Sequence, residues 1–222
     1  MIEDRLKGKK FVASYSGGKD SVLAIYKAVN EGMVPLGLLT AYKSDAFFSW
    51  FHGMSGELLQ KVSESLNIPL TLIRTTGEQY NVNFENALIK ARDEGAQVCV
   101  FGDIDIAGHL EWCTERCGNT GLIPYFPLCG KKRKEVVYEF IDAGFSAIIK
   151  IVDTSRLPDD FLGQTLCREV IDEIEKHGAD VCGEEGEYHT FVYNGPLFAN
   201  KIDFTVKGRL TMGQYAVLDL GS

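Results

Sequence analysis

The chain has 222 residues, of which 45% are hydrophobic and 24% are charged, and its formal net charge is −8 at pH 7. This balance is typical of a soluble globular protein with one large domain, or with one domain and a small lobe. The acidic charge argues against a broad nucleic-acid footprint, which needs clustered Lys and Arg. No apolar run is long enough to cross a bilayer, so we expect no membrane-spanning helix.

Two features bear on the compartment of the protein. The first ten residues are charged and contain no hydrophobic core region, so we expect no signal peptide. The six cysteines are scattered and none forms a Cys-x-x-Cys pair, which favours reduced thiols in a cytoplasmic protein. Cys113 and Cys117 would share a helix face. Two thiols without a nearby His make a weak metal site, and small buried residues are the better interpretation.

A short glycine-rich turn joins the first two predicted elements. Residues 11–15 are hydrophobic and strand-like, and residues 22–29 have the pattern of a helix. The glycine-rich turn between them reads Ser16-Gly17-Gly18-Lys19-Asp20-Ser21. Glycines let a backbone approach phosphate oxygens closely, and the free N–H groups at a helix start point at them. This turn is therefore predicted to bind phosphate.

The side chains of the turn fit the same purpose. Ser16 and Ser21 add hydroxyl donors, and Lys19 adds a point charge. Asp20 is either a ligand of a divalent cation or a cap in the first helical turn. The turn is not a Walker P-loop, because Gly18-Lys19 is followed by Asp and no Gly stands five positions before Gly18. An ordinary capped turn between a strand and a helix is the alternative interpretation.

Strand-like and helix-like patterns then alternate along the first half of the chain. Strands are expected at 34–40, 70–74, 98–101 and 122–127, with helices at 57–66, around 84–91 and around 109–113. Such alternation implies right-handed crossovers and a parallel sheet with helices on both faces. We therefore predict an α/β fold with a doubly wound sheet.

Two places in this half are candidates for a ligand site. Asp103 follows the strand at 98–101, and carboxylates at the carboxyl end of a parallel strand face the ligand crevice. A helix cap is the competing interpretation of Asp103. The stretch Tyr42–Gly53 is crowded with aromatic residues, so it either packs down or lines a pocket. His52, within it, belongs to a residue type that packs or hydrogen-bonds more often than it catalyses.

The chain changes character near Gly130. A basic run at 131–134 opens a predicted helix that ends at Asp142, and antiparallel strands are expected toward the end of the chain. We therefore predict two parts: the α/β domain over 1–130, and a smaller α+β region over 131–222.

Two further elements are predicted in the second part. A β-rich run covers 147–152 and contains Lys150, which either faces solvent on an edge strand or reaches a phosphate or carboxylate in the cleft. Leu166, Val170 and Ile174 mark the core face of the next helix.

An acidic loop follows that helix. It reads Cys182-Gly183-Glu184-Glu185-Gly186-Glu187-Tyr188-His189-Thr190 and precedes a strand at 191–193. Taken alone, it is an acidic surface turn. However, glycines around charges just before a buried strand are typical of a backbone that turns around a ligand. We expect Glu184, Glu187 and Tyr188 to face the glycine-rich turn across a cleft.

The glycine-rich turn and the acidic loop, with Ile148-Ile149-Lys150-Ile151 between them, resemble the ATP-binding diphthine–ammonia ligase family over nearly the whole chain. The turn matches the PP-loop of the ATP pyrophosphatases, which the family carries on a domain of the HUP type. Typical members read Cys-Gly-Glu-Gly-Gly-Glu-Tyr-Glu-Thr in the acidic loop. This chain has Glu185 where Gly is usual and His189 where Glu is usual, a variant whose substrate need not be diphthine.

The resemblance implies a cytoplasmic carbon–nitrogen ligase with ATP and Mg²⁺ as cofactors. A substrate carboxylate is adenylated with release of pyrophosphate, and ammonia or ammonium then gives the amide and AMP. The acidic loop would bind ammonium or deprotonate it, and His189, which titrates near neutral pH, would share that role. The resemblance implies that the catalytic residues are Lys19, Glu184, Glu187 and His189. The residues it implies for nucleotide binding are Ser16, Gly17, Gly18, Lys19, Asp20, Ser21 and Asp103, with Asp20 as the metal ligand. The residues it implies for substrate binding are Lys150, Gly183, Gly186, Tyr188 and Thr190.

The acceptor and the partners are left open. The resemblance implies diphthine on an elongation factor, and the alternative is another carboxylate, for example a cobalamin-related one in a bacterium. A tRNA-modifying PP-loop enzyme and a non-catalytic nucleotide-binding module are further alternatives, and pyrophosphate release or stimulation by tRNA distinguishes them. The resemblance leaves room for a homodimer, with no membrane partner.

Overall fold

The computed structural model describes residues 5–43 and 53–221, so His52 and most of the aromatic stretch around it lie outside the described residues. The larger sheet has five parallel strands in the order β3-β2-β1-β4-β5. They are β1 (Lys10–Ser14), β2 (Val34–Lys43), β3 (Leu70–Thr75), β4 (Val98–Val100) and β5 (Ile123–Tyr125). Each overlaps a predicted strand. The proline-containing β5 lies at the sheet edge, where Pro is tolerated.

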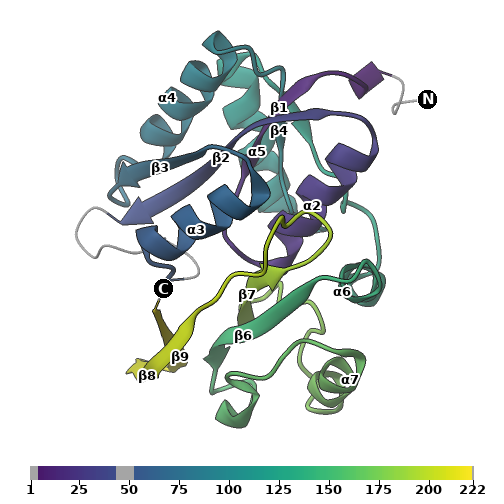
Figure 1. Cartoon of the computed structure of the whole chain (residues 1–222), viewed down its shortest axis with the longest axis vertical. Helices are drawn as coiled ribbons and strands as arrows, with labels where there is room; N and C mark the ends of the chain where they lie inside the picture. Colours follow the sequence, from purple (N-terminus) through teal and green to yellow (C-terminus); the bar gives the residue numbers. More distant parts are fainter. Residues whose placement is uncertain (1–4, 44–52, 222) are drawn as a thin grey trace.

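Four helices of the described part cover the two faces of this sheet (Figure 1). Helices α2 (Lys19–Asn30) and α3 (Gly56–Leu66) pack on one face, and α4 (Tyr80–Asp93) and α5 (Ala107–Thr120) pack on the other. Because side chains alternate along a strand, Phe11 and Ala13 of β1 join the core under the first pair, and Val12 joins the core under the second. The predicted doubly wound α/β class is confirmed, and its switch point lies between β1 and β4. Within the described ranges, no helix is both long and apolar enough to cross a membrane.

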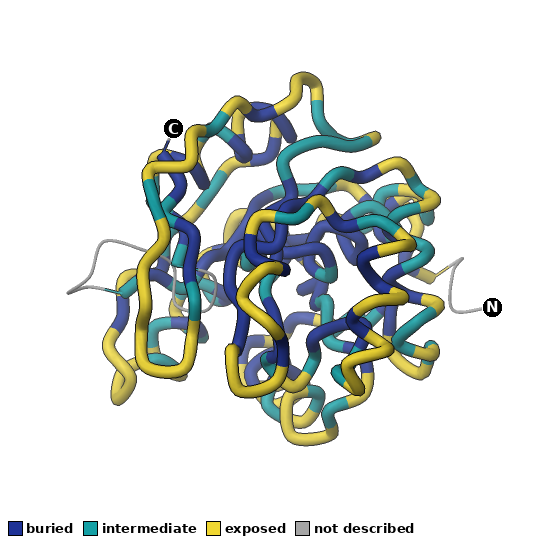
Figure 2. The backbone as a smooth tube through the Cα atoms, turned by 90° about the horizontal axis from the view of Figure 1, so that it is seen from below, coloured by how far each residue is buried: buried dark blue, intermediate teal, exposed yellow. Residues whose placement is uncertain are grey.

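The second sheet has four antiparallel strands in the order β7-β6-β9-β8. The elements of this half are α6 (Arg133–Asp142), β6 (Ser146–Asp153), the short 3₁₀ helix η1 (Asp159–Phe161), α7 (Arg168–Lys176), β7 (Tyr188–Asn194), β8 (Thr205–Met212) and β9 (Tyr215–Gly221). Figure 2 shows β8 as an exposed edge strand, whereas β6 lies inside the sheet and is buried. This is the smaller α+β region that the sequence predicts.

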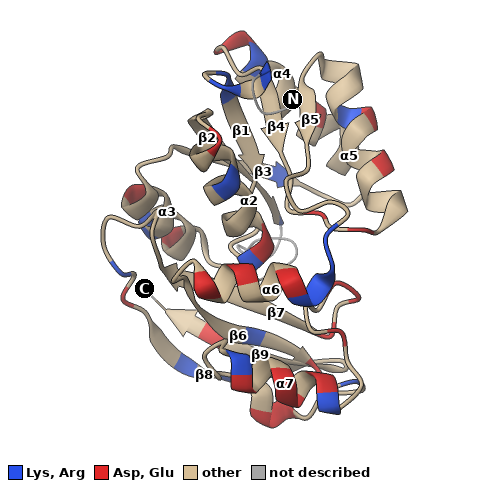
Figure 3. Ribbon diagram, turned by 90° about the vertical axis from the view of Figure 1, so that its right-hand side faces the viewer, with Lys and Arg blue, Asp and Glu red and all other residues tan. Residues whose placement is uncertain are grey.

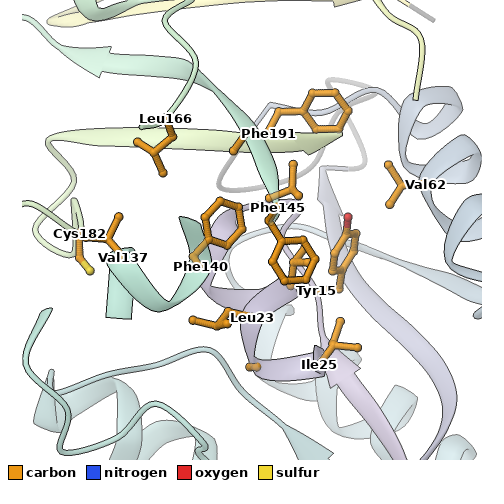
Figure 4. Close-up of a cluster of buried hydrophobic side chains, with 14 of the residues drawn as sticks. Tyr15, Leu23, Ile25, Val62, Val137, Phe140, Phe145, Leu166, Cys182 and Phe191 are labelled. Atoms are coloured by element: carbon orange, nitrogen blue, oxygen red, sulfur yellow. The ribbon is translucent and has the colours of Figure 1, made fainter. Parts of the chain in front are cut away.

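One hydrophobic core joins the two sheets (Figure 4). Leu23 and Ile25 of α2 are buried in it together with Phe140 of α6 and Phe191 of β7. The rings of Phe140 and Phe145 stack with centroids 5.1 Å apart. Each large apolar side chain contributes about 1.5–3 kcal/mol when it is fully buried, so this core holds the second sheet against α2. The division of the chain into two domains stays a prediction, since the core is continuous between the sheets.

Candidate functional site

A cavity of about 380 Å³ opens at the carboxyl ends of β1 and β4, at the switch point of the larger sheet. Ser16, Asp20 and Ser21 of the glycine-rich turn line one side of it. Glu184 and His189 of the acidic loop line another side. Strand β7, which the acidic loop enters, lies next to α2 (Figure 1). The two stretches that stand out in the sequence therefore meet at one cavity.

Local contacts shape the glycine-rich turn. The Ser21 hydroxyl donates to the Gly18 carbonyl oxygen at 2.9 Å, and the Ser16 and Ser21 hydroxyl oxygens lie 3.3 Å apart. Gly17 has φ +90°, which favours glycine. Gly102, just after β4, approaches so closely that a Cβ there would lie 2.7 Å from a backbone carbon of α2. The backbone therefore requires glycine at both positions.

Hydrogen bonds fasten the acidic loop and β7 to this turn. The backbone N–H of Lys19 donates to Thr190 Oγ1 at 3.0 Å, and the backbone N–H of Val192 donates to the Gly17 carbonyl oxygen at 3.0 Å. Lys19 Nζ donates to the carbonyl oxygen of Cys182. Thr190, which the resemblance assigns to the substrate, here accepts one of the N–H groups at the start of α2.

The ammonium group of Lys19 points toward the acidic loop. Its Nζ lies 2.7 Å from Asp20 Oδ2 and 5.3 Å from the ring centroid of Tyr188. Burial by itself lowers the pKa of Lys19, but Asp20 and other neighbours raise the pKa well above its usual value, so the group stays charged. The Tyr188 hydroxyl donates to the Val181 carbonyl oxygen at 2.7 Å. Lys19 thus holds the acidic loop in place, and its action on phosphate stays a prediction.

Asp20 presents an unpartnered oxygen to the site. Its Oδ1 is buried and has no hydrogen-bond partner, and burial raises the pKa of the carboxyl group against the opposing effect of Lys19. Mg²⁺ is commonly held by one or two carboxylates together with substrate phosphates and waters. Among the described residues no cluster of three or more His, Cys, Asp or Glu side chains forms a complete metal site. The residues therefore fit a Mg²⁺ ion that arrives with phosphate oxygens, and they do not fit a structural metal.

Glu184 and His189 titrate far from their ordinary values. Burial, reinforced by Asp20, raises the pKa of Glu184 to about 7. Burial, reinforced by Lys19 and Lys150, lowers the pKa of His189 to about 4. The expectation that His189 titrates near neutral pH is therefore wrong, and its imidazole is uncharged at pH 7. The pKa of Glu184, by contrast, lies near neutral pH.

Glu187 lies on a different side of the acidic loop. Its buried carboxylate accepts hydrogen bonds from Arg156 Nη1 at 2.9 Å and from the backbone N–H of Glu185 at 3.2 Å. The Glu185 carboxylate in turn lies 3.5 Å from Arg156 and 3.6 Å from Arg133. Figure 3 shows the basic start of α6 beside acidic segments of neighbouring loops. The predicted placement of Glu187 across the cleft from the glycine-rich turn is therefore wrong, because the Arg156 pair directs its carboxylate elsewhere.

The two glycines of the acidic loop have different surroundings. Gly183 lines the cavity, has φ +66°, and would place a Cβ 2.7 Å from the Tyr188 carbonyl oxygen. Gly186 has φ +88°, but a Cβ there would meet nothing within 4 Å. Backbone conformation explains both glycines, and close packing constrains only Gly183.

Asp103 lines the cavity, as one of its two interpretations predicts. The N-cap of α5 is Ile106, so the helix-cap interpretation of Asp103 is wrong. Its carboxylate accepts a hydrogen bond from Cys113 Sγ at 3.8 Å and lies 3.7 Å from His109 Nδ1. Burial raises the pKa of Asp103.

Lys150 is buried inside the second sheet. The pairing of β6 with β7 is irregular between Ile149 and Ile151, and Lys150 Nζ donates to the Gly53 carbonyl oxygen at 3.1 Å. Burial lowers the pKa of Lys150 to about 8. Since β6 has a neighbour on each side, the edge-strand interpretation is wrong. Lys150 is not among the described residues that line the cavity, and its contact with substrate stays a prediction.

The sequence did not identify the residues of α4 and α5 that line the cavity as part of a site. These residues are Tyr80 of α4 and His109, Trp112 and Cys113 of α5. The three α5 residues are spaced i, i+3 and i+4, which places them on one helix face. Together with their position early in a helix that follows a parallel strand, this spacing is the signal that could have identified them.

Comparison with known proteins places the chain in a family. The model of the diphthamide synthase N-terminal domain matches residues 9–124, and that of the diphthamide synthase C-terminal domain matches residues 132–218. The chain belongs to the diphthamide synthase family. The cavity is lined from both matched ranges, with Asp20 in the first and Glu184 in the second.

Two curated relatives and one solved structure are similar to this chain. The diphthine–ammonia ligase of Rattus norvegicus is 28% identical over 220 residues, which cover 87% of this chain and 82% of the relative. That of Homo sapiens is 37% identical over 90 residues, which cover 39% of this chain and 34% of the relative. A crystal structure from Methanocaldococcus jannaschii, described as a predicted subunit of tRNA methyltransferase, has a TM-score of 0.49 and 14% identity. It covers 87% of this chain and 100% of its own.

Proposed function

We propose that this protein adenylates a substrate carboxylate with ATP and joins it to ammonia, with AMP and pyrophosphate as products. The observation that carries the proposal is the meeting of the glycine-rich turn and Glu184 at one cavity, at the carboxyl ends of β1 and β4. The family and the names of its curated relatives support ATP-dependent amidation as the reaction type.

The glycine-rich turn would bind the phosphates. The hydroxyls of Ser16 and Ser21 line the cavity, and the positive end of the α2 dipole favours negative charge there. Asp20 Oδ1 would hold Mg²⁺, which when bound supplies charge neutralisation to the leaving pyrophosphate. Lys19 would hold the acidic loop against the turn through Asp20 and the Cys182 carbonyl.

Glu184 would serve the second step. A carboxylate oxygen of the acceptor first attacks the α-phosphorus, and pyrophosphate leaves with the electrons of the broken bond. Ammonia then attacks the acyl carbon, AMP leaves, and Glu184 takes the extra proton from nitrogen. A base with a pKa of about 7 is well matched to this task at neutral pH. Glu187 would act as a positioning residue, through Arg156 and the backbone of Glu185.

The acceptor we propose is diphthine on an elongation factor, because the curated relatives are diphthine–ammonia ligases. A second candidate is another carboxylate. It is favoured by one observation: His189, which stands where the resemblance leads us to expect Glu, lines the cavity as an uncharged imidazole. With His189 in place of Glu, the cavity wall therefore carries less negative charge at this position.

The test is a product analysis. Purified protein is incubated with Mg·ATP, ammonium chloride and the diphthine-bearing elongation factor, and nucleotides are separated by chromatography. AMP and pyrophosphate that depend on the acceptor, together with a one-unit loss of acceptor mass on amidation, are expected. ADP as the main product would contradict the proposal. AMP release that requires tRNA instead would favour a tRNA-modifying enzyme.

A further inference from the structure

Arg133, the first residue of α6, joins two loops that contribute to the cavity. Its Nε and Nη2 donate to the two carboxylate oxygens of Asp105 at 2.9 and 2.8 Å, the paired geometry that suits a planar guanidinium. Its Nη1 donates to Asp180 Oδ2 at 3.0 Å. Asp105 lies in the loop between β4 and α5, and Asp180 lies just before the acidic loop. One side chain therefore holds the two loops together.

Asp180 organises the backbone of the acidic loop. The Oδ2 atom that accepts from Arg133 also accepts from the backbone N–H of Glu184 at 2.8 Å. Its Oδ1 accepts from the backbone N–H of Cys182 at 3.2 Å, and its carbonyl oxygen accepts from the backbone N–H of Gly183 at 3.0 Å. The place of the Glu184 backbone therefore depends on a carboxylate that Arg133 holds from the other side.

Contacts of the main chain support the same arrangement. The backbone N–H of Gly130, shortly before α6, donates to the Ile104 carbonyl oxygen at 3.3 Å. Ile104 is in the loop that also carries Asp103, which lines the cavity. Cys182 Sγ of the acidic loop donates to the Arg133 carbonyl oxygen at 2.8 Å. The start of α6 is therefore fixed to both loops.

We propose that Arg133 is a positioning residue, which sets the place of Glu184 in the cavity by holding Asp180 against the loop between β4 and α5. Arg133 is not among the described residues that line the cavity, so it acts through Asp180. The catalytic step that we assign to Glu184 rests on the proposed function, whereas its positioning by Arg133 does not.

The alternative is an ordinary surface ion pair, which contributes little to stability and nothing to the site. Two observations distinguish the Arg133 contacts from such a pair. The side chain of Arg133 is only 25% exposed and that of Asp180 only 11%. The hydrogen bonds from Arg133 also hold the pKa of Asp105 below its usual value. Because Arg133 holds both carboxylates at once, its loss frees one loop from the other.

The first measurement needs no turnover. In the whole chain, the NMR amide proton signal of Glu184 reports its hydrogen bond to Asp180, and Arg133→Gln should move this signal upfield as that bond weakens. Arg133→Lys keeps the charge but lacks the planar fork, so it should move the signal less. The matched control is Lys132→Gln, which removes the adjacent, 85% exposed charge and should leave the signal unchanged.

A Glu184 signal that stays in place in folded Arg133→Gln would overturn the proposal, and so would an equal movement in Lys132→Gln. If Arg133→Gln does not fold, Asp105→Asn replaces it, because it removes the partially exposed carboxylate that holds the guanidinium from the opposite side.

The second measurement is the rate of amide formation in a single turnover, together with KM for ATP. Arg133→Gln should slow amide formation about tenfold, because a displaced base transfers protons poorly, and should leave KM for ATP within about twofold. Asp180→Asn should have a similar effect, and the double variant should lose no more than the weaker single variant.

The same substitution in the Glu184→Gln background separates positioning from a general loss of structure. Arg133→Gln should cause no further loss there, since the group that it positions is already gone. A rate that falls by the same factor in both backgrounds would overturn the proposal. Failure of the parent chain to release AMP would contradict the proposed function, and the Glu184 amide signal would still decide whether Arg133 positions this residue.

Discussion

The glycine-rich turn and the acidic loop meet at the same cavity, yet they are built in different ways. The turn is shaped largely by its own residues, with hydroxyl contacts between Ser16, Gly18 and Ser21. The acidic loop has local contacts too, such as the bond from the Glu185 N–H to the Glu187 carboxylate, but it is also held by Lys19 and Arg156, which are far away in the sequence. A sequence motif therefore predicts which groups line a site only where contacts among the motif's own residues determine its conformation.

The acidic loop shows this most clearly in its carboxylates. Glu184 lines the cavity, where burial and the charge of Asp20 raise its pKa to about 7. Glu187, three positions on, is equally part of the motif but forms an ion pair with Arg156 at 2.9 Å. One carboxylate is therefore available for proton transfer, and the other holds the loop.

The strongest test of how the loop is built is Gly183→Ala. Its positive φ and the 2.7 Å approach to the Tyr188 carbonyl oxygen should together lower the free energy of unfolding by about 3 kcal/mol. Gly186→Ala is the matched control, since it shares the positive φ without the close contact, and it should cost about 1 kcal/mol. Urea unfolding measures both variants. Equal losses would show that packing around Gly183 does not shape the loop.

The division of labour between the carboxylates is tested by Glu184→Gln. Removing the general base should lower amide formation about 100-fold, or about 2.7 kcal/mol, with ATP affinity retained. Single-turnover assays with the adenylate trapped by ammonium measure the second step alone. If Glu187→Gln has the same effect on this step at unchanged stability, then the distinction between the two residues is wrong.

The turn is tested by Asp20→Ala and Ser21→Ala. Each should weaken nucleotide binding or turnover at least tenfold, which is about 1.4 kcal/mol, because each removes a group at the phosphate end of the cavity. Calorimetry with Mg·ATP and turnover assays provide the measurement. The Asp20 variant should also lose most of the Mg²⁺ dependence of binding. Unchanged affinity and rate in both variants would remove the turn from the nucleotide site.

The structural role of Glu187 gives a smaller effect. Glu187→Gln leaves one amide oxygen for two donors, Arg156 and the Glu185 N–H, and should lower the free energy of unfolding by about 1 kcal/mol. Glu185→Gln, at an exposed carboxylate with looser contacts, is the control and should leave stability unchanged. Both values come from urea midpoints. A larger loss for Glu185→Gln would mean that the loop is held from its exposed side.

The smallest effect concerns the dependence of stability on pH. The raised pKa of Glu184 means that the folded state holds its proton longer than the unfolded chain, so this residue lowers stability as pH rises from about 4.5 to 7. The depressed pKa of His189 acts oppositely, and it raises stability as pH rises from about 4 to 6.5.

Single variants separate these opposing contributions, each on the order of 1 kcal/mol after screening. Glu184→Gln should make stability rise more steeply with pH across this window, and His189→Asn should make it fall. Thermal or urea unfolding between pH 4 and 7.5 supplies the measurement. If the curves of stability against pH for both variants run parallel to that of the parent chain, then burial in the cavity shifts the pKa of neither Glu184 nor His189.

Much of the fold follows from the sequence because its signals are local. The hydrophobic runs and their periods predict all five strands of the parallel sheet, and β-α alternation predicts its doubly wound form. The glycine-rich turn is readable for the same reason: its glycines, hydroxyls and carboxylate act on a backbone only a few residues long. For Asp103 the sequence left a site role and a helix cap equally open, and the structure decided for the cavity.

Only the tertiary structure decides where the remaining charged groups act. Glycines with positive φ at 183 and 186 turn the acidic loop between its carboxylates, and the sequence spacing alone cannot say which of them faces the cavity. The contacts that settle it come from Lys19 and Arg156, in other parts of the chain. Burial likewise sets the pKa of Glu184 and of His189, and burial is a property of the packed sheets. The sequence therefore determined which groups are available, and long-range packing determined which of them reach the cavity and in which charge state.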